Sequence, residues 1–261
     1  MAEILASQGA HISLLARDPD RLTTARQRVM DARRSKSQQI RVLAADVADY
    51  NQLSSVLLPA LEAFGTPDLL VNSAGITYPG LFAQLDLEIH RQNMEINYFG
   101  TLHTTGLIVN GMIQRGSGHI VNISSLVGIH GLYGYSAYSP SKFAVRGLSD
   151  VLRYELKPHG IQVSVVFPSD TETPQLEFEK NLKPPALKAL VDSSTKPFPA
   201  DVVAQKIIVG IRKEKFLILP SSDSVLLFWM YSLFPGHSFY WLVDRLMDMA
   251  HRKAAKDLAG K

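Results

Sequence analysis

The sequence contains no cysteine among its 261 residues. This absence excludes disulfide bonds, cysteine nucleophiles and thiolate metal sites. The eight histidines show no spacing typical of metal ligands, so no metal site is expected. The first six residues do not have a basic segment followed by an apolar one, and we expect them to form part of a helix that ends at Gly9 rather than a signal peptide.

The chain also lacks a strong charge imbalance. Its formal net charge is +3 and its pI is near 9.0, and the densest basic stretch covers residues 26–36. We expect this stretch to be the solvated face of a helix and its exit loop, with contact to an anionic surface as the alternative. No nucleic-acid motif is present and the basic balance is weak, so no nucleic-acid partner is expected.

What the sequence does contain is a regular alternation of apolar strands and amphipathic helices. With 46% hydrophobic and 20% charged residues, it has the composition of a folded domain with a core. The expected strands are residues 11–16, 40–45, 69–72, 119–123, 161–167 and 216–219, and the expected helices are 19–34, 50–64, 87–115, 137–157 and 199–213. Alternation with crossover-length connections predicts an α/β fold with a doubly wound parallel sheet.

The strongest chemical signal is a tyrosine and a lysine four residues apart, Tyr138 and Lys142, in an expected helix. Residues at this spacing share one face of a helix. A nearby cation favours the phenolate and lowers the pKa of the tyrosine, which makes the phenol usable as an acid or base near neutral pH. The alternative interpretation is an exposed helical pair.

Two polar residues strengthen this interpretation. Ser125 follows an apolar strand thirteen residues before Tyr138, and a hydroxyl at a strand end is placed to hold a carbonyl oxygen. The alternative for Ser125 is simple turn chemistry. Asn97 lies within an expected helix, where asparagine is unfavourable, and it is placed to bind a water that relays protons to Lys142. The alternative is a solvent-facing asparagine.

Together with the turn of residues 71–75, these motifs resemble the short-chain dehydrogenase/reductase family over residues 1–220. The resemblance implies a catalytic tetrad of Asn97, Ser125, Tyr138 and Lys142. In the family, the tyrosine donates a proton to the carbonyl oxygen and the serine orients the carbonyl. The lysine lowers the tyrosine pKa and binds the nicotinamide ribose, and the asparagine anchors the proton-relay water.

The cofactor preference follows from the end of the strand at residues 11–16. Enzymes that use NAD place an acid there for the ribose 2′-hydroxyl, whereas an arginine accepts a 2′-phosphate. The strand ends in Ala16-Arg17, which favours NADPH/NADP. The resemblance extends the cofactor site to Asp46, Val47, Asn72, Ala74, Gly75, Tyr138, Lys142, Pro168, Thr171 and Thr173. Ser169 stands where the family usually has glycine, which leaves the local backbone path open.

Three segments, residues 131–148, 154–158 and 168–174, are most similar to the 3-ketodihydrosphingosine (3-dehydrosphinganine) reductases within this family. That resemblance implies NADPH-dependent reduction of the 3-ketone of a long-chain 2-amino-1-hydroxy base to sphinganine, in sphingolipid biosynthesis. One alternative is a reductase or dehydrogenase for another apolar carbonyl or alcohol, such as a steroid or retinoid. An alternative of a different class is a non-catalytic lipid-surface or scaffold protein.

One expected element is absent from the start of the chain. A dinucleotide-binding fold opens with a strand and a glycine-rich turn, and no Gly-x-x-x-Gly-x-Gly occurs near residue 1. Because that first strand is normally central, residues 11–16 and 40–45 would lack a bridge to the other strands. We expect the gene product to begin roughly 30 residues earlier and the chain as written to bind NADPH poorly.

The segment of residues 221–261 forms an apolar and aromatic extension of the expected 1–220 domain. Pro235-Gly236 interrupts it, so an interfacial or re-entrant hairpin is favoured over a straight span, with Trp229 and Trp241 at a membrane surface. The alternative is a flap over the active site or an oligomer contact. In a eukaryote, the resemblance implies the cytosolic face of the endoplasmic reticulum, and the family is commonly homo-oligomeric.

Overall fold

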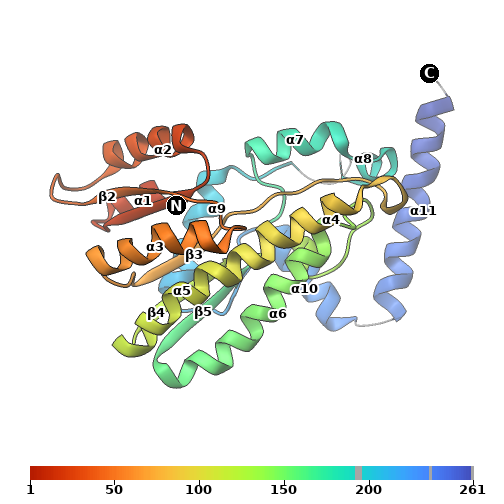
Figure 1. Cartoon of the computed structure of the whole chain (residues 1–261). Coiled ribbons are helices and arrows are strands. Elements are labelled where there is room, and N and C mark those ends of the chain that lie inside the picture. Colours follow the sequence, from red (N-terminus) through yellow and green to blue (C-terminus); the bar gives the residue numbers. More distant parts are fainter. Residues whose placement is uncertain (192–195, 235–236, 260–261) are drawn as a thin grey trace.

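The computed structural model describes residues 1–191, 196–234 and 237–259, and Figure 1 shows parallel strands covered by helices on both faces. Four strands form one parallel sheet in the order β3 (Leu69–Asn72), β4 (Gly118–Ile123), β5 (Ile161–Val166) and β6 (Leu217–Ile218). The predicted α/β architecture with a parallel sheet is therefore confirmed.

The two remaining strands pair with each other and not with the larger sheet. β1 (Ile12–Ala16) and β2 (Ile40–Ala44) form a parallel ladder in which Ile12 pairs with Ile40. Within the described ranges no strand is hydrogen-bonded between β1 and β3. This matches the expectation that residues 11–16 and 40–45 lack a bridge to the other strands.

The helices follow the expected order, with several additions. They are α1 (Ala2–Ser7), α2 (Pro19–Ala32), α3 (Tyr50–Phe64), α4 (Leu87–Asn93), α5 (Gly100–Arg115), α6 (Tyr138–Leu156), α7 (Pro174–Leu182), α8 (Pro185–Val191), α9 (Ala200–Arg212), α10 (Ser222–Leu233) and α11 (His237–Ala259). Side chains of Asp18 and Asp49 cap the first turns of α2 and α3. Short 3₁₀ turns η1 (Phe82–Gln84), η3 (Leu126–Gly128) and η4 (Lys157–His159) complete the list.

The helix expected over residues 87–115 is interrupted. A π-helical segment, η2 (Met94–Phe99), separates α4 from α5 and contains Asn97. A π-turn inserts a residue into the helical spacing and is frequent at functional sites. Asn97, a residue type that is unfavourable in a regular α-helix, therefore lies in the widened π-helical turn.

The core lies on both faces of the larger sheet. On one face, Leu53 of α3 and Met112 of α5 are fully buried with Ile120 of β4. On the other face, Val121 and Val166 pack against Ile207 of α9. Two covered faces explain why the strands are apolar on both sides rather than alternating.

The carboxyl ends of β4 and β5 are covered by segments that the sequence did not predict as helices. Residues 174–199, for which the sequence predicted no helix, contain α7 and α8. The extension forms α10 and α11, and α11 packs against α8 at the right of Figure 1. The predicted break at Pro235-Gly236 lies outside the described residues.

Candidate active site

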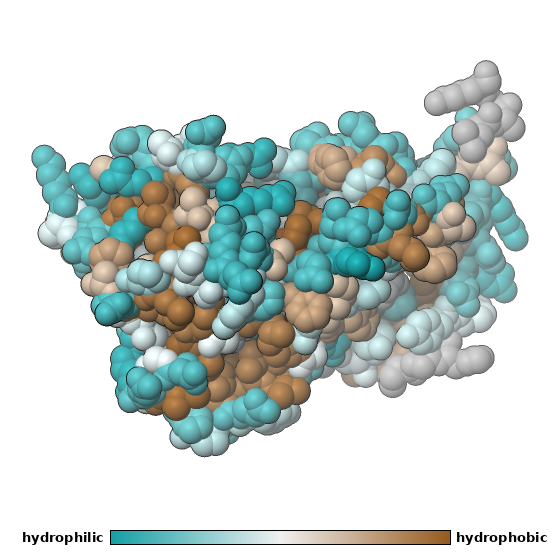
Figure 2. Space-filling model, in the orientation of Figure 1, coloured by the Kyte–Doolittle hydropathy of each residue, from teal (hydrophilic) through white to brown (hydrophobic). Residues whose placement is uncertain are grey.

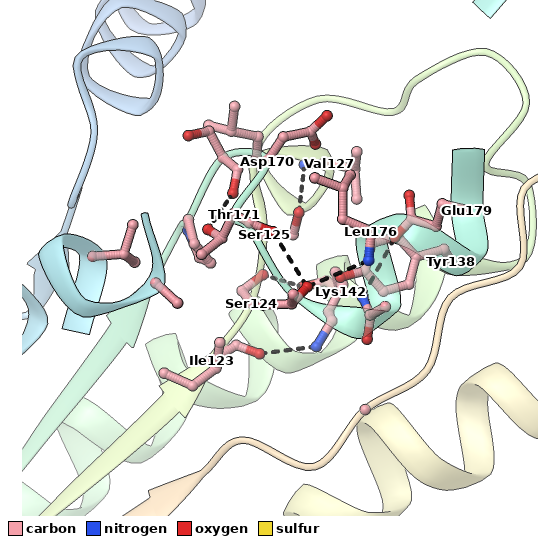
Figure 3. A pocket seen from close by; sticks show the side chains of 18 of the residues that line it. Ile123, Ser124, Ser125, Val127, Tyr138, Lys142, Asp170, Thr171, Leu176 and Glu179 are labelled. Carbon is pink, nitrogen blue, oxygen red and sulfur yellow. Dashed lines mark hydrogen bonds between the residues drawn. The ribbon is translucent and has the colours of Figure 1, made fainter. Parts of the chain in front are cut away.

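A cavity of about 510 Å³ opens at the carboxyl ends of β4 and β5, between the first turn of α6 and α7 (Figure 3). Crevices at this edge of parallel sheets are common binding sites. The predicted site residues that line the cavity are Gly75, Ser125, Tyr138, Lys142, Pro168, Thr171 and Thr173. Residues separated by nearly one hundred positions thus meet in one space.

Tyr138 begins α6 and is buried beside Ser125, which follows β4. Hydrogen bonds from Ser125 and Gln175 to the phenol oxygen lower its pKa, but burial and the nearby Glu179 carboxylate outweigh them and raise the pKa above its ordinary value. The predicted lowering of this pKa by Lys142 is therefore wrong for this structure, because removal of the phenol from water disfavours the phenolate. Burial therefore favours the neutral form of the Tyr138 phenol.

Lys142 lies one helical turn beyond Tyr138 and is also buried. Its Nζ donates to the carbonyl oxygen of Ile123 at 3.0 Å and lies 5.6 Å from the centre of the Tyr138 ring. Burial lowers the pKa of Lys142 to about 8. The spacing of Tyr138 and Lys142 therefore produces the expected shared face, with the ammonium behind the phenol (Figure 3).

Asn97 links three elements. Its Oδ1 accepts from the Ile76 N–H at 2.8 Å, and its Nδ2 donates to the Ile76 carbonyl at 2.9 Å and to Ser141 Oγ at 2.8 Å. A Cβ on Gly75 would lie 3.0 Å from Asn97 Oδ1 and 3.4 Å from Lys142 Nζ, so glycine permits this close approach. Asn97 thus positions the turn after β3 against α6, and its predicted water-binding role remains a prediction.

The residues predicted to hold the adenosine end lie apart from this cavity. Arg17 follows β1, and its guanidinium lies 3.9 Å from the Asp46 carboxylate, which follows β2. Val47 is buried where a Cβ on Gly100 would collide with it. These residues form a separate group beside the smaller sheet.

Asn72 and Ala74 do not line the cavity either. The Asn72 side chain is buried in the larger sheet, where its Nδ2 donates to Thr105 Oγ1 at 3.0 Å and to Asn122 Oδ1 at 2.8 Å. Asn72 therefore supports the sheet from within, and the predicted cofactor contacts of Asn72 and Ala74 remain predictions.

The structure resolves the backbone path after β5. Ser169, which replaces the expected glycine, donates to Ser221 Oγ at 2.8 Å. Thr171 Oγ1 donates to the Ser169 carbonyl at 2.9 Å, and Thr173 caps α7 by accepting from the Leu176 N–H at 3.3 Å. The segment is thereby fixed at the cavity wall.

Sequence reasoning missed three residues of this wall, Tyr135, Gln175 and Glu179. Tyr135 donates its phenol O–H to Glu179 Oε2 at 2.6 Å. A signal was available, because Thr173 followed by Pro174 is typical of a helix start. A helix from Pro174 puts Gln175 and Glu179 on one face.

Comparisons with known proteins agree with this geometry. The family model described as short chain dehydrogenase matches residues 1–182. The chain is 40% identical over 202 residues to the 3-dehydrosphinganine reductase of Danio rerio, covering 77% of this chain and 60% of that protein. It is 36% identical over 221 residues to the 3-ketodihydrosphingosine reductase of Mus musculus, covering 84% of this chain and 66% of that protein.

Among solved structures, the chain is similar to a short-chain dehydrogenase from Sphingobium yanoikuyae in complex with NADPH. The TM-score is 0.73 at 25% identity, covering 98% of this chain and 89% of the other. The chain thus spans 60% and 66% of the two curated relatives above, and it aligns over most of this solved enzyme. With the family model matched from residue 1 to 182 and the Ser125, Tyr138 and Lys142 side chains gathered in one cavity, this chain belongs to the short-chain dehydrogenase family.

Proposed function

We propose that this chain reduces 3-ketodihydrosphingosine to sphinganine with NADPH. The observation that carries the proposal is the buried, neutral Tyr138 phenol hydrogen-bonded by Ser125 inside a cavity, with the Lys142 ammonium behind it. The choice of substrate is based on the names of the relatives of 36% and 40% identity, which are 3-ketodihydrosphingosine (3-dehydrosphinganine) reductases.

The chain's own residues account for the proton. Tyr138 donates its phenol proton to the carbonyl oxygen, and the raised pKa means that the proton is present at neutral pH. The Ser125 hydroxyl orients the same oxygen. The Lys142 ammonium lies 5.6 Å from the centre of the phenol ring, and Asn97 holds the turn at Gly75 against α6.

When bound, NADPH supplies the hydride to the carbonyl carbon. The residues present fit its two ends. The Arg17 side chain is 63% exposed, so its guanidinium can contact a 2′-phosphate while Asp46 lies 3.9 Å from it. Lys142 and Thr171 line the cavity at the nicotinamide end. The described residues provide no glycine-rich turn for the pyrophosphate, so the fit covers the two ends alone.

The substrate is tested by steady-state turnover of 3-ketodihydrosphingosine against a steroid ketone, each with NADPH and with NADH. We expect turnover of the sphingoid ketone with NADPH and little turnover of the steroid. Equal or faster reduction of the steroid would contradict the substrate, and equal use of NADH would contradict the role of Arg17.

The C-terminal helices support contact with a membrane surface. They expose large apolar side chains: Leu226, Trp229, Leu233, Phe234, Tyr240, Trp241, Leu246 and Met249. Cationic residues of α11 accompany them, namely Arg245, Arg252, Lys253 and Lys256. None of the described helices has the length and apolarity needed to cross a bilayer. A surface-lying arrangement would place the enzyme beside a lipid-borne ketone.

The inner side of the same helices covers the domain. The His130 ring lies 4.8 Å from the Phe239 ring, and Phe228 and Tyr231 pack on the cluster around Phe167. These contacts support a role of the extension as a flap over the domain. This role is compatible with membrane contact, since one face of the helix pair packs inward and the other is exposed.

A second copy of the chain is the proposed partner of a different face. Leu102 of α5 and Phe143, Val151 and Tyr154 of α6 are exposed apolar side chains, and Figure 2 shows apolar residues gathered where Figure 1 draws α5 and α6. Apolar patches of this kind are typical of oligomer contacts. The molar mass of wild type and Val151→Lys is measured by light scattering. A monomeric mass for both proteins would contradict this assembly.

A further inference from the structure

Glu179 of α7 is a buried acid in the cavity wall. Its side chain is 7% exposed, and Figure 3 shows it next to Tyr138. Tyr135 donates to its Oε2 at 2.6 Å, and the Tyr135 ring lies 5.9 Å from the Tyr138 ring. The carboxylate is therefore held in a fixed position close to the proton-donating phenol.

Among the residues that the structure describes, Glu179 forms no ion pair, because the nearby lysines pair with other acids. Lys183 Nζ lies 3.5 Å from another acid of the cavity, Asp170, and Lys180 pairs with the exposed Glu177. Gln175 contributes only a neutral donor, 3.5 Å from Oε1. Burial raises the pKa of Glu179, while the Tyr135 hydrogen bond and the Lys183 charge lower it.

A buried carboxylate is costly unless a cation compensates it. The proposed substrate has such a cation, because its amino group is attached to the carbon next to the carbonyl. With the carbonyl oxygen on Tyr138, the ammonium must lie against a neighbouring part of the wall. Glu179 is a buried acid of that wall. Tyr135 links it to Tyr138, because the Tyr135 phenol donates to Glu179 and the Tyr135 ring lies beside the Tyr138 ring.

We propose that Glu179 binds the 2-ammonium group of the substrate and thereby selects 2-amino ketones over ketones that have the same chain but no amino group. This inference rests on the proposed function. Tyr135 positions the carboxylate, and the charge-assisted contact forms only when an amino ketone enters. Glu179 is thus a specificity residue and has no part in the proton transfer.

The test compares KM and kcat of the full chain for a long-chain 2-amino 3-ketone and its des-amino analogue. Wild type should have a KM about 10- to 100-fold lower for the amino ketone, as expected for a charged hydrogen bond. Glu179→Gln should remove this preference by raising only the amino-ketone KM. The matched control is Glu177→Gln on the same helix, an exposed acid that should change neither value.

Two outcomes overturn the inference. One is equal KM values of wild type for the two ketones, a result that does not depend on the folding of any variant. The other is a Glu179→Gln variant whose KM rises equally for both. If wild type reduces neither ketone, the proposed reaction fails, and binding of the 2-amino alcohol against its des-amino counterpart then decides the inference by the same preference and its loss in Glu179→Gln.

Discussion

Tyr138 is neutral because it is buried, and its role as proton donor can be tested at this single atom. Tyr138→Phe removes the O–H while keeping the ring, so we expect kcat to fall by about 10²- to 10⁴-fold with little change in cofactor binding. Steady-state kinetics and NADPH fluorescence measure the two effects. Tyr50→Phe, on the half-exposed tyrosine of α3, should leave both unchanged. Retained activity in Tyr138→Phe would refute the assignment.

Lys142 gives a prediction about pH and stability. Its pKa is about 8 in the folded chain and near its ordinary 10.5 when unfolded, so between these values the unfolded chain binds more protons. The contribution of Lys142 to the free energy of unfolding therefore rises with pH across this window and is least favourable below pH 8.

Urea unfolding of wild type and Lys142→Met at several pH values measures this contribution, since other titrating groups cancel in the difference. We expect the stability of wild type relative to the variant to increase from pH 8 to pH 10.5. A constant difference would mean that the lysine is not perturbed by burial.

At the scale of elements, the site depends on the close approach of η3 to α6. A Cβ on Gly128 would collide with Ser124 Oγ and lie 2.9 Å from the backbone carbonyl oxygen of Lys142. Because backbone cannot move aside as a flexible side chain can, Gly128→Ala should separate the Ser125 turn from α6. We expect a loss of about 1–3 kcal/mol in the free energy of unfolding and a lower kcat.

Gly106→Ala is the matched control for this prediction. Gly106 is exposed in the middle of α5, and a Cβ there would meet no atom within 4 Å. The better helix propensity of alanine should make this variant up to about 1 kcal/mol more stable. If chemical denaturation finds the two variants equally stable, the close approach at Gly128 has no energetic consequence.

At the scale of the whole molecule, the exposed face of α10 and α11 should bind lipid. Trp229→Ala combined with Trp241→Ala removes two half-exposed rings, and we expect binding to vesicles of phosphatidylcholine and phosphatidylserine to weaken at least about tenfold. Vesicle flotation measures the bound fraction. The control pair, Leu58→Ala with Phe64→Ala, removes side chains of similar exposure from α3 and should have no effect. Equal flotation of all three proteins would exclude the proposed surface.

The amino-acid sequence by itself determined the parallel α/β architecture and the grouping of Ser125, Tyr138 and Lys142, because these depend on local spacing: period and alternation for the sheet, and one helical turn for the pair in α6. The sequence also indicated the family. Only the tertiary structure decided the protonation of Tyr138 and the presence of Glu179 beside it, because burial and charge at a point depend on segments far apart in the chain. Desolvation by such packing exceeded the local influence that the Tyr138–Lys142 spacing predicted.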